Sequence, residues 1–244
     1  MRALTDRLSV LEQVLCVPNL GTRNPIAGPA DIDPLIRAIK RKAMFADIHW
    51  TILQGIDWER IDRVGRCLTP SSGPEHLRVA LPDATLEITH PTAVVDYAYL
   101  AFDGLVAALV NMTDTLGRLL NRAYQLEIEK ERASLLAVRD KCAVGSTLGV
   151  VLHAPQYTGW IRKVKMLRGD CQHEEVEEML IAPARPYACR GEPIIDQEYS
   201  WGDPPQQTPL IAYAAEATRA AKECIMAVVA AIEACPMNPT KSPG

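Results

Sequence analysis

The segment from Trp160 to Glu175 holds the residues of this 244-residue chain that are best suited to chemistry. Arg168 and His173 lie five positions apart in it. A histidine has an unperturbed pKa of about 6.5, so it can accept or donate a proton near neutral pH. An arginine is a permanent cation with several hydrogen-bond donors, which suits a phosphate or a developing anion. The pair therefore predicts acid–base chemistry beside a phosphate.

The charges on either side of Gly169 predict a break between two helices. Basic residues stabilise a helix C-terminus and acidic residues an N-terminus, while Gly169 and Asp170 suit the positions between. On an unbroken helix, Arg168 and His173 would point about 140° apart. The break, or a second copy related by two-fold symmetry, would bring them together. The flanking charges are Arg162, Lys163, Lys165 and Arg168 before the break, and Glu174, Glu175, Glu177 and Glu178 after it.

The sequence from Arg168 to His173 resembles the Arg-x(4–6)-His motif of the HEPN superfamily of all-α proteins, many of them bacterial ribonucleases. The stretch from Phe102 to Tyr124 is similar to the long helix of bacterial HEPN-like proteins, and the likeness covers residues 92–235. It implies metal-independent RNA cleavage, in which the ribose 2′-OH attacks the adjacent phosphate. His173 would then move the proton, and Arg168 would stabilise the charged transition state. Two protomers commonly pair in this family so that both motifs line one cleft.

The resemblance also implies supporting roles for other residues. Asp170 would orient the imidazole or cap the helix. Asp114 and Asn121, seven positions apart, would support the site from one face of the long helix. The local positive field for RNA would come from Arg162, Lys163 and Lys165. The function implied is an endoribonuclease, of the kind that serves as a toxin or a phage-defence effector.

A non-catalytic function stays open beside the ribonuclease. Arg168 would then pair with Glu174 or Glu175 at an ordinary helix break, and His173 would be a plain residue of the second helix. Such a helical module would form a homodimer or bind a protein partner, such as an antitoxin. The acidic balance and the aliphatic helix seam favour this alternative.

Other chemistry has little support in the sequence. His49, His76, His90 and His153 have no partners at metal-ligand spacing, so we expect no metal. The phosphate-loop, dinucleotide and serine-hydrolase motifs are missing, so we expect no cofactor. The cysteines are odd in number, seven, with no C-x-x-C pair, which predicts reduced thiols, a passive Cys171 and a cytoplasmic setting.

Prolines and apolar periodicity predict the elements that position these residues. Proline inside a helix costs about 3 kcal/mol, so long helices are expected in the proline-free windows. These windows are 35–69, 92–154, 156–182 and 210–235, with loops at 17–34, 70–76 and 183–209. The long helix near 92–126 has a core seam with steps of three and four: Phe102, Leu105, Leu109, Met112, Leu116, Leu119, Ala123 and Leu126. The first window has a looser helical spacing: Leu35, Ile39, Met44, Ile48, Ile52 and Ile56.

Residues 77–89 alternate with period two, which predicts a small β-hairpin with a four-residue turn. Leu81 would lie opposite Leu86, and Val79 opposite Ile88. The predicted fold is an all-α bundle of about five main helices with this hairpin appended. Residues 1–91 would hold the N-terminal helices and the hairpin, 92–235 the HEPN-like bundle, and 236–244 a disordered tail.

Composition excludes several classes of protein. Hydrophobic residues make up 48% and charged residues 23%, as in ordinary globular proteins. The net charge is −4 and the chain has no long basic block, so duplex DNA is not an expected partner. Its longest apolar run is far short of the roughly 20 residues that cross a bilayer, so no membrane association is expected.

Overall fold

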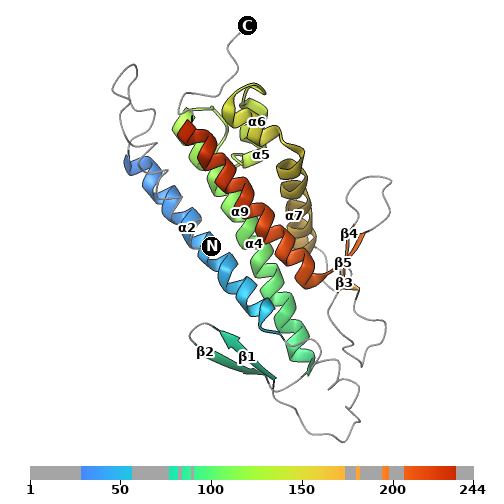
Figure 1. Ribbon diagram of the computed structural model, residues 1–244. Coiled ribbons are helices and arrows are strands. Elements are labelled where there is room, and N and C mark those ends of the chain that lie inside the picture. The colour runs from blue at the N-terminus through green and yellow to red at the C-terminus, as the bar shows by residue number, and fades with distance from the viewer. Residues whose placement is uncertain are drawn as a thin grey trace, which may run out of the picture. The chain divides into compact units, whose positions relative to one another are not determined.

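The computed structural model describes residues 29–56, 77–81, 84–88, 91–173, 180–181, 194–197 and 206–234. Six helices dominate this part of the chain (Figure 1), which confirms the all-α prediction. Within the described residues, none of them is both long and apolar enough to cross a membrane. The predicted tail, 236–244, and the loop at 70–76 lie outside the described residues. The helices are α2 (Pro29–Gln54), α4 (Pro91–Tyr124), α5 (Leu135–Lys141), α6 (Thr147–His153), α7 (Pro155–His173) and α9 (Leu210–Ala234).

Two short strands, β1 (Leu77–Leu81) and β2 (Ala84–Ile88), pair antiparallel. Val79 lies opposite Leu86 and Leu81 opposite Ala84, so the predicted register is wrong by two residues. Two residues separate the strands instead of the predicted four. The pairing extends as far as Leu81 and Ala84, which leaves the two-residue connection that hairpins commonly use.

A second, three-stranded sheet lies in the order β3-β4-β5 (Leu180–Ile181, Ile194–Gln197 and Gln206–Pro209), and all of its pairs are antiparallel. The predicted loop at 183–209 is therefore wrong for β4 and β5, and the helix window that ended at 182 is wrong for β3. The two consecutive isoleucines that open β4 are β-branched residues, which favour strands.

Two compact units make up the chain. Unit 1 comprises 1–45, 108–164 and 218–244, and unit 2 comprises 46–107 and 165–217. Helices α2, α4, α7 and α9 each contribute residues to both units. Within each unit, the α2 and α7 segments run in the opposite direction to the α4 and α9 segments (Figure 1). The predicted division at residue 91 stays a prediction.

The seam predicted for α4 is confirmed, because all eight of its residues are buried, seven of them in α4 and Leu126 just beyond its end. The helix also makes a close approach in unit 1. Gly117 faces the backbone of Ser134 and Leu135, where α5 begins, so that a Cβ at this position would overlap the Ser134 carbonyl carbon. The Ser134 side chain caps α5 by accepting a hydrogen bond from the Ala137 amide at 3.3 Å.

Helix α2 begins within the predicted loop at 17–34, which is a correction to the proline argument. Proline is favoured at the first position of a helix, where the missing N–H has no intrahelical partner. Pro29 occupies that position, and Pro34 lies exposed one turn later. Pro34 removes one backbone hydrogen bond, and the helical stretch that follows is long enough to tolerate this loss.

Candidate functional site

Helix α7 runs without interruption from Pro155 to His173, so the predicted break at Gly169 and Asp170 is wrong. A glycine inside a helix costs only about 1 kcal/mol, and the sequence from 156 to 182 has no proline to stop the helix. The capping preferences of Gly169 and Asp170 are therefore too weak to end it. The side chains of residues 169–173, including the predicted catalytic His173, lie outside the described residues.

The unbroken helix separates the two positions of the Arg-x(4)-His motif. Position 173 lies seven residues after the exposed Met166, on the same side of α7. Arg168 lies four residues after the buried Val164, on the same side of the helix as that residue. It is therefore about 140° away from position 173 around the helix axis. Its Nε atom is buried and makes no hydrogen bond within the described part of the chain. One copy of α7 therefore does not bring Arg168 and position 173 together.

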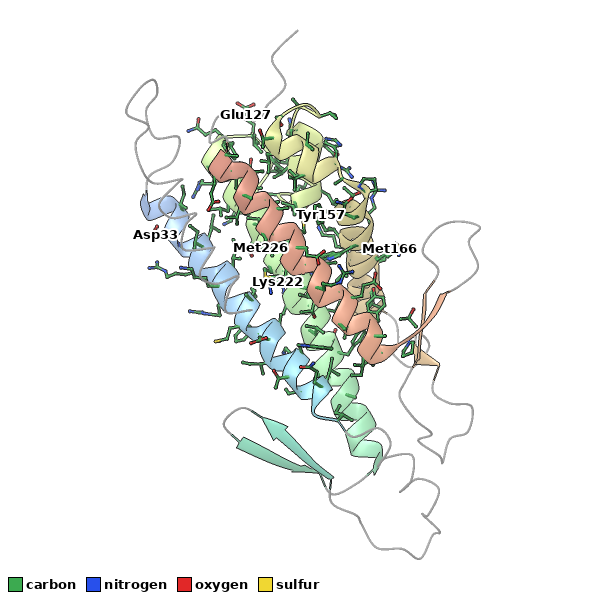
Figure 2. The ribbon with its side chains drawn as sticks, viewed as in Figure 1. Asp33, Glu127, Tyr157, Met166, Lys222 and Met226 are labelled. Atoms are coloured by element: carbon green, nitrogen blue, oxygen red, sulfur yellow. The ribbon has the colours of Figure 1, made fainter. Side chains whose placement is uncertain are left out.

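The basic residues of α7 surround its exposed side. Arg162 is exposed one turn before Met166, which Figure 2 shows on this helix. Lys163 and Lys165 are half-buried on either side of that row. No acidic residue occurs between Pro155 and Arg168, so the local field is positive although the whole chain is acidic.

Asn121 has a structural role at the end of α4. Its Nδ2 donates to the Ile128 carbonyl at 2.8 Å, and its Oδ1 accepts from the Ile128 amide at 3.1 Å. This clamp closes a connection in which Gln125 and Glu127 adopt left-handed φ values of 50° and 57°. Both polar atoms of the amide are thus committed to the fold, and neither points to an RNA site.

Replacing Asn121 with alanine is expected to lower the free energy of unfolding by about 1–2 kcal/mol, because two hydrogen bonds to one backbone unit are lost. Chemical denaturation followed by circular dichroism measures the change. Glu131→Ala, at an exposed position of the same connection, is the control and is expected to stay within about 0.5 kcal/mol of the native chain. Equal losses in the two variants would contradict the clamp.

Asp114, the other predicted supporting residue of α4, is half-buried in unit 1. It lies two turns before Asn121 on the same side of the helix, as its spacing predicts. Arg168 and position 173 belong to unit 2, so the structure defines no common site for the four residues.

An unpredicted histidine contact lies in unit 2, between α2 and α4. The imidazole of His49 packs against Gly104, where a Cβ would lie 2.8 Å from its Nδ1 and overlap the rest of the ring. Nδ1 is buried and has no hydrogen-bond partner among the described residues. Burial lowers the pKa of His49, and the neighbouring Asp103 carboxylate acts in the opposite direction. The sequence signal for this contact is Gly104, because a glycine in a helix interior marks close packing there.

The lowered pKa of His49 makes the fold sensitive to mild acid. The unfolded chain takes up a proton near pH 6.5 before the folded chain does, so stability falls as pH drops below about 6.5. We expect His49→Gln to show a smaller loss of stability than the native chain between about pH 7.5 and pH 5.5. Asp103→Asn should show a larger loss, because the carboxylate that favours the imidazolium is removed. Urea denaturation at both pH values checks this, and parallel pH profiles would contradict it.

The described cysteines are poor candidates for chemistry. Burial raises the pKa of Cys142 to about 11 and that of Cys224 to about 12, so both stay protonated at neutral pH. Among the described residues, no three His, Cys, Asp or Glu side chains gather in a way that could hold a metal ion.

Helix α2 presents an apolar surface that sequence reasoning missed. Met44, Phe45 and Ile48 are exposed by 51%, 38% and 44%. The looser spacing predicted for this window is therefore wrong for Met44 and Ile48, which lie off the buried face. Ile39 and Ile52 of that spacing are buried in α2, together with Ile32, Ile36, Ala43, Ala46 and Leu53.

Basic side chains adjoin this surface. Arg41 is exposed one turn before Met44 and Arg37 two turns before it, on the same side of α2. The Lys42 ammonium lies 5.7 Å from the centroid of the Phe45 ring, a cation–π distance. We call the row formed by Arg37, Arg41, Met44, Phe45 and Ile48 the α2 row.

No protein-family model, no curated protein and no solved structure matches this chain. The likeness to HEPN proteins therefore rests on the Arg-x(4)-His spacing and the long helix alone.

Proposed function

We propose that this protein is a non-catalytic helical module that binds another polypeptide through the α2 row. The observation that carries the proposal is the exposure of three large apolar side chains, Met44, Phe45 and Ile48, on one helix. Single apolar residues are common on protein surfaces, but adjacent ones framed by charges are typical of protein-binding surfaces. Arg37 and Arg41 favour a partner with acidic residues beside its own apolar ones.

The unbroken α7 supports a binding function over catalysis. A general acid or base has to lie within hydrogen-bond reach of the reacting groups that the cation stabilises. The helical positions of Arg168 and residue 173 lie about 140° apart around the axis of α7, which disfavours that convergence within a single chain.

Photo-crosslinking tests the binding function. Phe45 is replaced by p-benzoylphenylalanine, which keeps an aromatic ring at the site and links to nearby polypeptide under light. We expect adducts from position 45 and none from the same replacement at Glu223, an exposed position of α9. Equal adduct yields at the two positions, or none at either, would overturn the proposal.

An endoribonuclease is the second candidate. The positive side of α7 favours it, because Arg162 lies on the same exposed side of the helix as position 173. Cleavage would need a second copy to supply the convergence that one helix lacks.

RNA cleavage by the purified protein separates the two candidates. The non-catalytic proposal predicts that the native chain and His173→Ala both leave RNA intact across salt and pH. Cleavage by the native chain that His173→Ala abolishes, and that copurified nuclease cannot explain, would overturn that proposal and establish the ribonuclease.

A further inference from the structure

The charges of α2 are arranged in an order that suits a second copy of the same helix. Four basic residues lie in the stretch from Arg37 to Lys42, ahead of the apolar residues. Asp47 follows them, and no lysine or arginine occurs in the rest of the helix. In an antiparallel pair of identical helices, the first half of one lies beside the second half of the other. Such pairing separates the two basic stretches, whereas parallel pairing would place them side by side.

The helical positions show which residues would meet. Because α2 is one continuous helix, about 100° per residue fixes the directions within it. Arg37, Arg41 and Ile48 lie within about 60° of Met44 on one side, and Lys40 and Asp47 lie together on the other, about 20° from each other. A two-fold axis perpendicular to both helices brings each flank against the same flank of the copy. Lys40 of one copy then meets Asp47 of the other when the axis passes close to Met44.

We propose that two copies of this chain associate antiparallel through α2, with Met44 near the two-fold axis. Ile48 of each copy covers the aliphatic stem of Arg41 of the other, and Lys40 pairs with Asp47 of the other copy. This inference rests on the proposed binding function and names the partner as a second copy. One helix face is smaller than the roughly 800 Å² per partner of a standard interface. The expected dimer is therefore weak, with a Kd on the order of 10 μM.

A charge-swap series tests the arrangement. Lys40 and Asp47 are seven positions apart, about 10 Å along the helix. Lys40→Glu and Asp47→Lys, each alone, place like charges opposite each other at two symmetric points. We expect each to raise the Kd at least about tenfold at low salt, and the double variant to return it to within about threefold of the native value. Sedimentation equilibrium of the full chain measures the Kd, and circular dichroism confirms that each variant is folded.

A second pair of variants tests the apolar centre. Ile48→Glu is expected to raise the Kd more than about thirtyfold, because it buries a carboxylate at the interface. Leu100→Glu introduces the same charge at an apolar residue of α4 that is 64% exposed, and it is expected to leave the Kd unchanged. The arrangement would be overturned if Ile48→Glu left the Kd unchanged, or if the double charge swap failed to restore association.

The outcomes also distinguish this inference from the proposed function. A native chain that stays monomeric, while p-benzoylphenylalanine at position 45 links to a different protein, overturns the dimer and leaves the binding function standing. Links from position 45 to residues 1–28 of the same chain would overturn both, because the α2 row would then be covered from within. A dimer that responds to the α2 variants supports both.

Discussion

Replacing Gly117 with alanine is expected to lower the free energy of unfolding by about 3 kcal/mol. The new Cβ would overlap the carbonyl carbon of Ser134 and lie 2.5 Å from the Leu135 nitrogen. Both are backbone atoms, so no side-chain rotation relieves the overlap, and the start of α5 has to move away from α4. Leu135, which is fully buried, would lose packing in that movement. Guanidinium denaturation followed by circular dichroism measures the loss.

Gly159→Ala is the matched control for this substitution. Gly159 lies inside α7, and among the described residues nothing beyond its own stretch of helix comes within 4 Å of the place where a Cβ would lie. Alanine is the better helix former, so this variant is expected to gain about 0.5–1 kcal/mol. If the same glycine-to-alanine change lowers stability at position 117 and raises it at position 159, then close helix approach, rather than glycine content, determines the effect. Similar effects in both variants would contradict the approach of α5 to α4 at Gly117.

The parts of the fold that the sequence predicts well have long, repeated patterns. The seam of α4 repeats over seven residues, and the alanine-rich α9 ends within one residue of its proline-free window. In such segments every turn of the helix supports the same structure, so one conflicting residue has little effect. This is why the two helices were predictable without tertiary information.

The features that were predicted wrongly depend on short signals. The break at Gly169 rested on capping preferences worth about 1 kcal/mol each, which a helix of 19 residues outweighs. The start of α2 was hidden by Pro29, because a proline reads as a helix breaker unless it occupies the first position. In the hairpin, alternation of apolar residues fits more than one register, and the turn length decides between them.

The candidate site was harder to predict, because it depends on which face of each helix is covered. The residue types of Arg168 and Asn121 suggest chemistry, yet the first has a buried Nε and the second is bound to the Ile128 backbone. Met44 and Ile48 suggest a core, yet both are exposed. A residue's side of a helix follows from spacing, but the side that meets a neighbour is set by the packing of distant segments.

Replacing Phe102 with alanine is expected to lower the free energy of unfolding by about 3–4 kcal/mol. Phe102 is only 2% exposed, and its ring meets that of Tyr213 edge to face, with 6.0 Å between centroids and 67° between planes. The substitution removes a large apolar side chain and leaves a cavity between α4 and α9 that neighbouring side chains fill only in part.

The chain offers a control two residues away on the same helix. Leu100 is 64% exposed, so Leu100→Ala is expected to change stability by less than about 0.5 kcal/mol. A double-mutant cycle with Tyr213→Ala isolates the ring pair, for which we expect a coupling of about 0.5–1.5 kcal/mol. Denaturation of the four chains in parallel measures it. Because the coupling needs both rings in place, a value of zero would mean that α4 and α9 do not meet at Phe102 and Tyr213, whatever the single losses are.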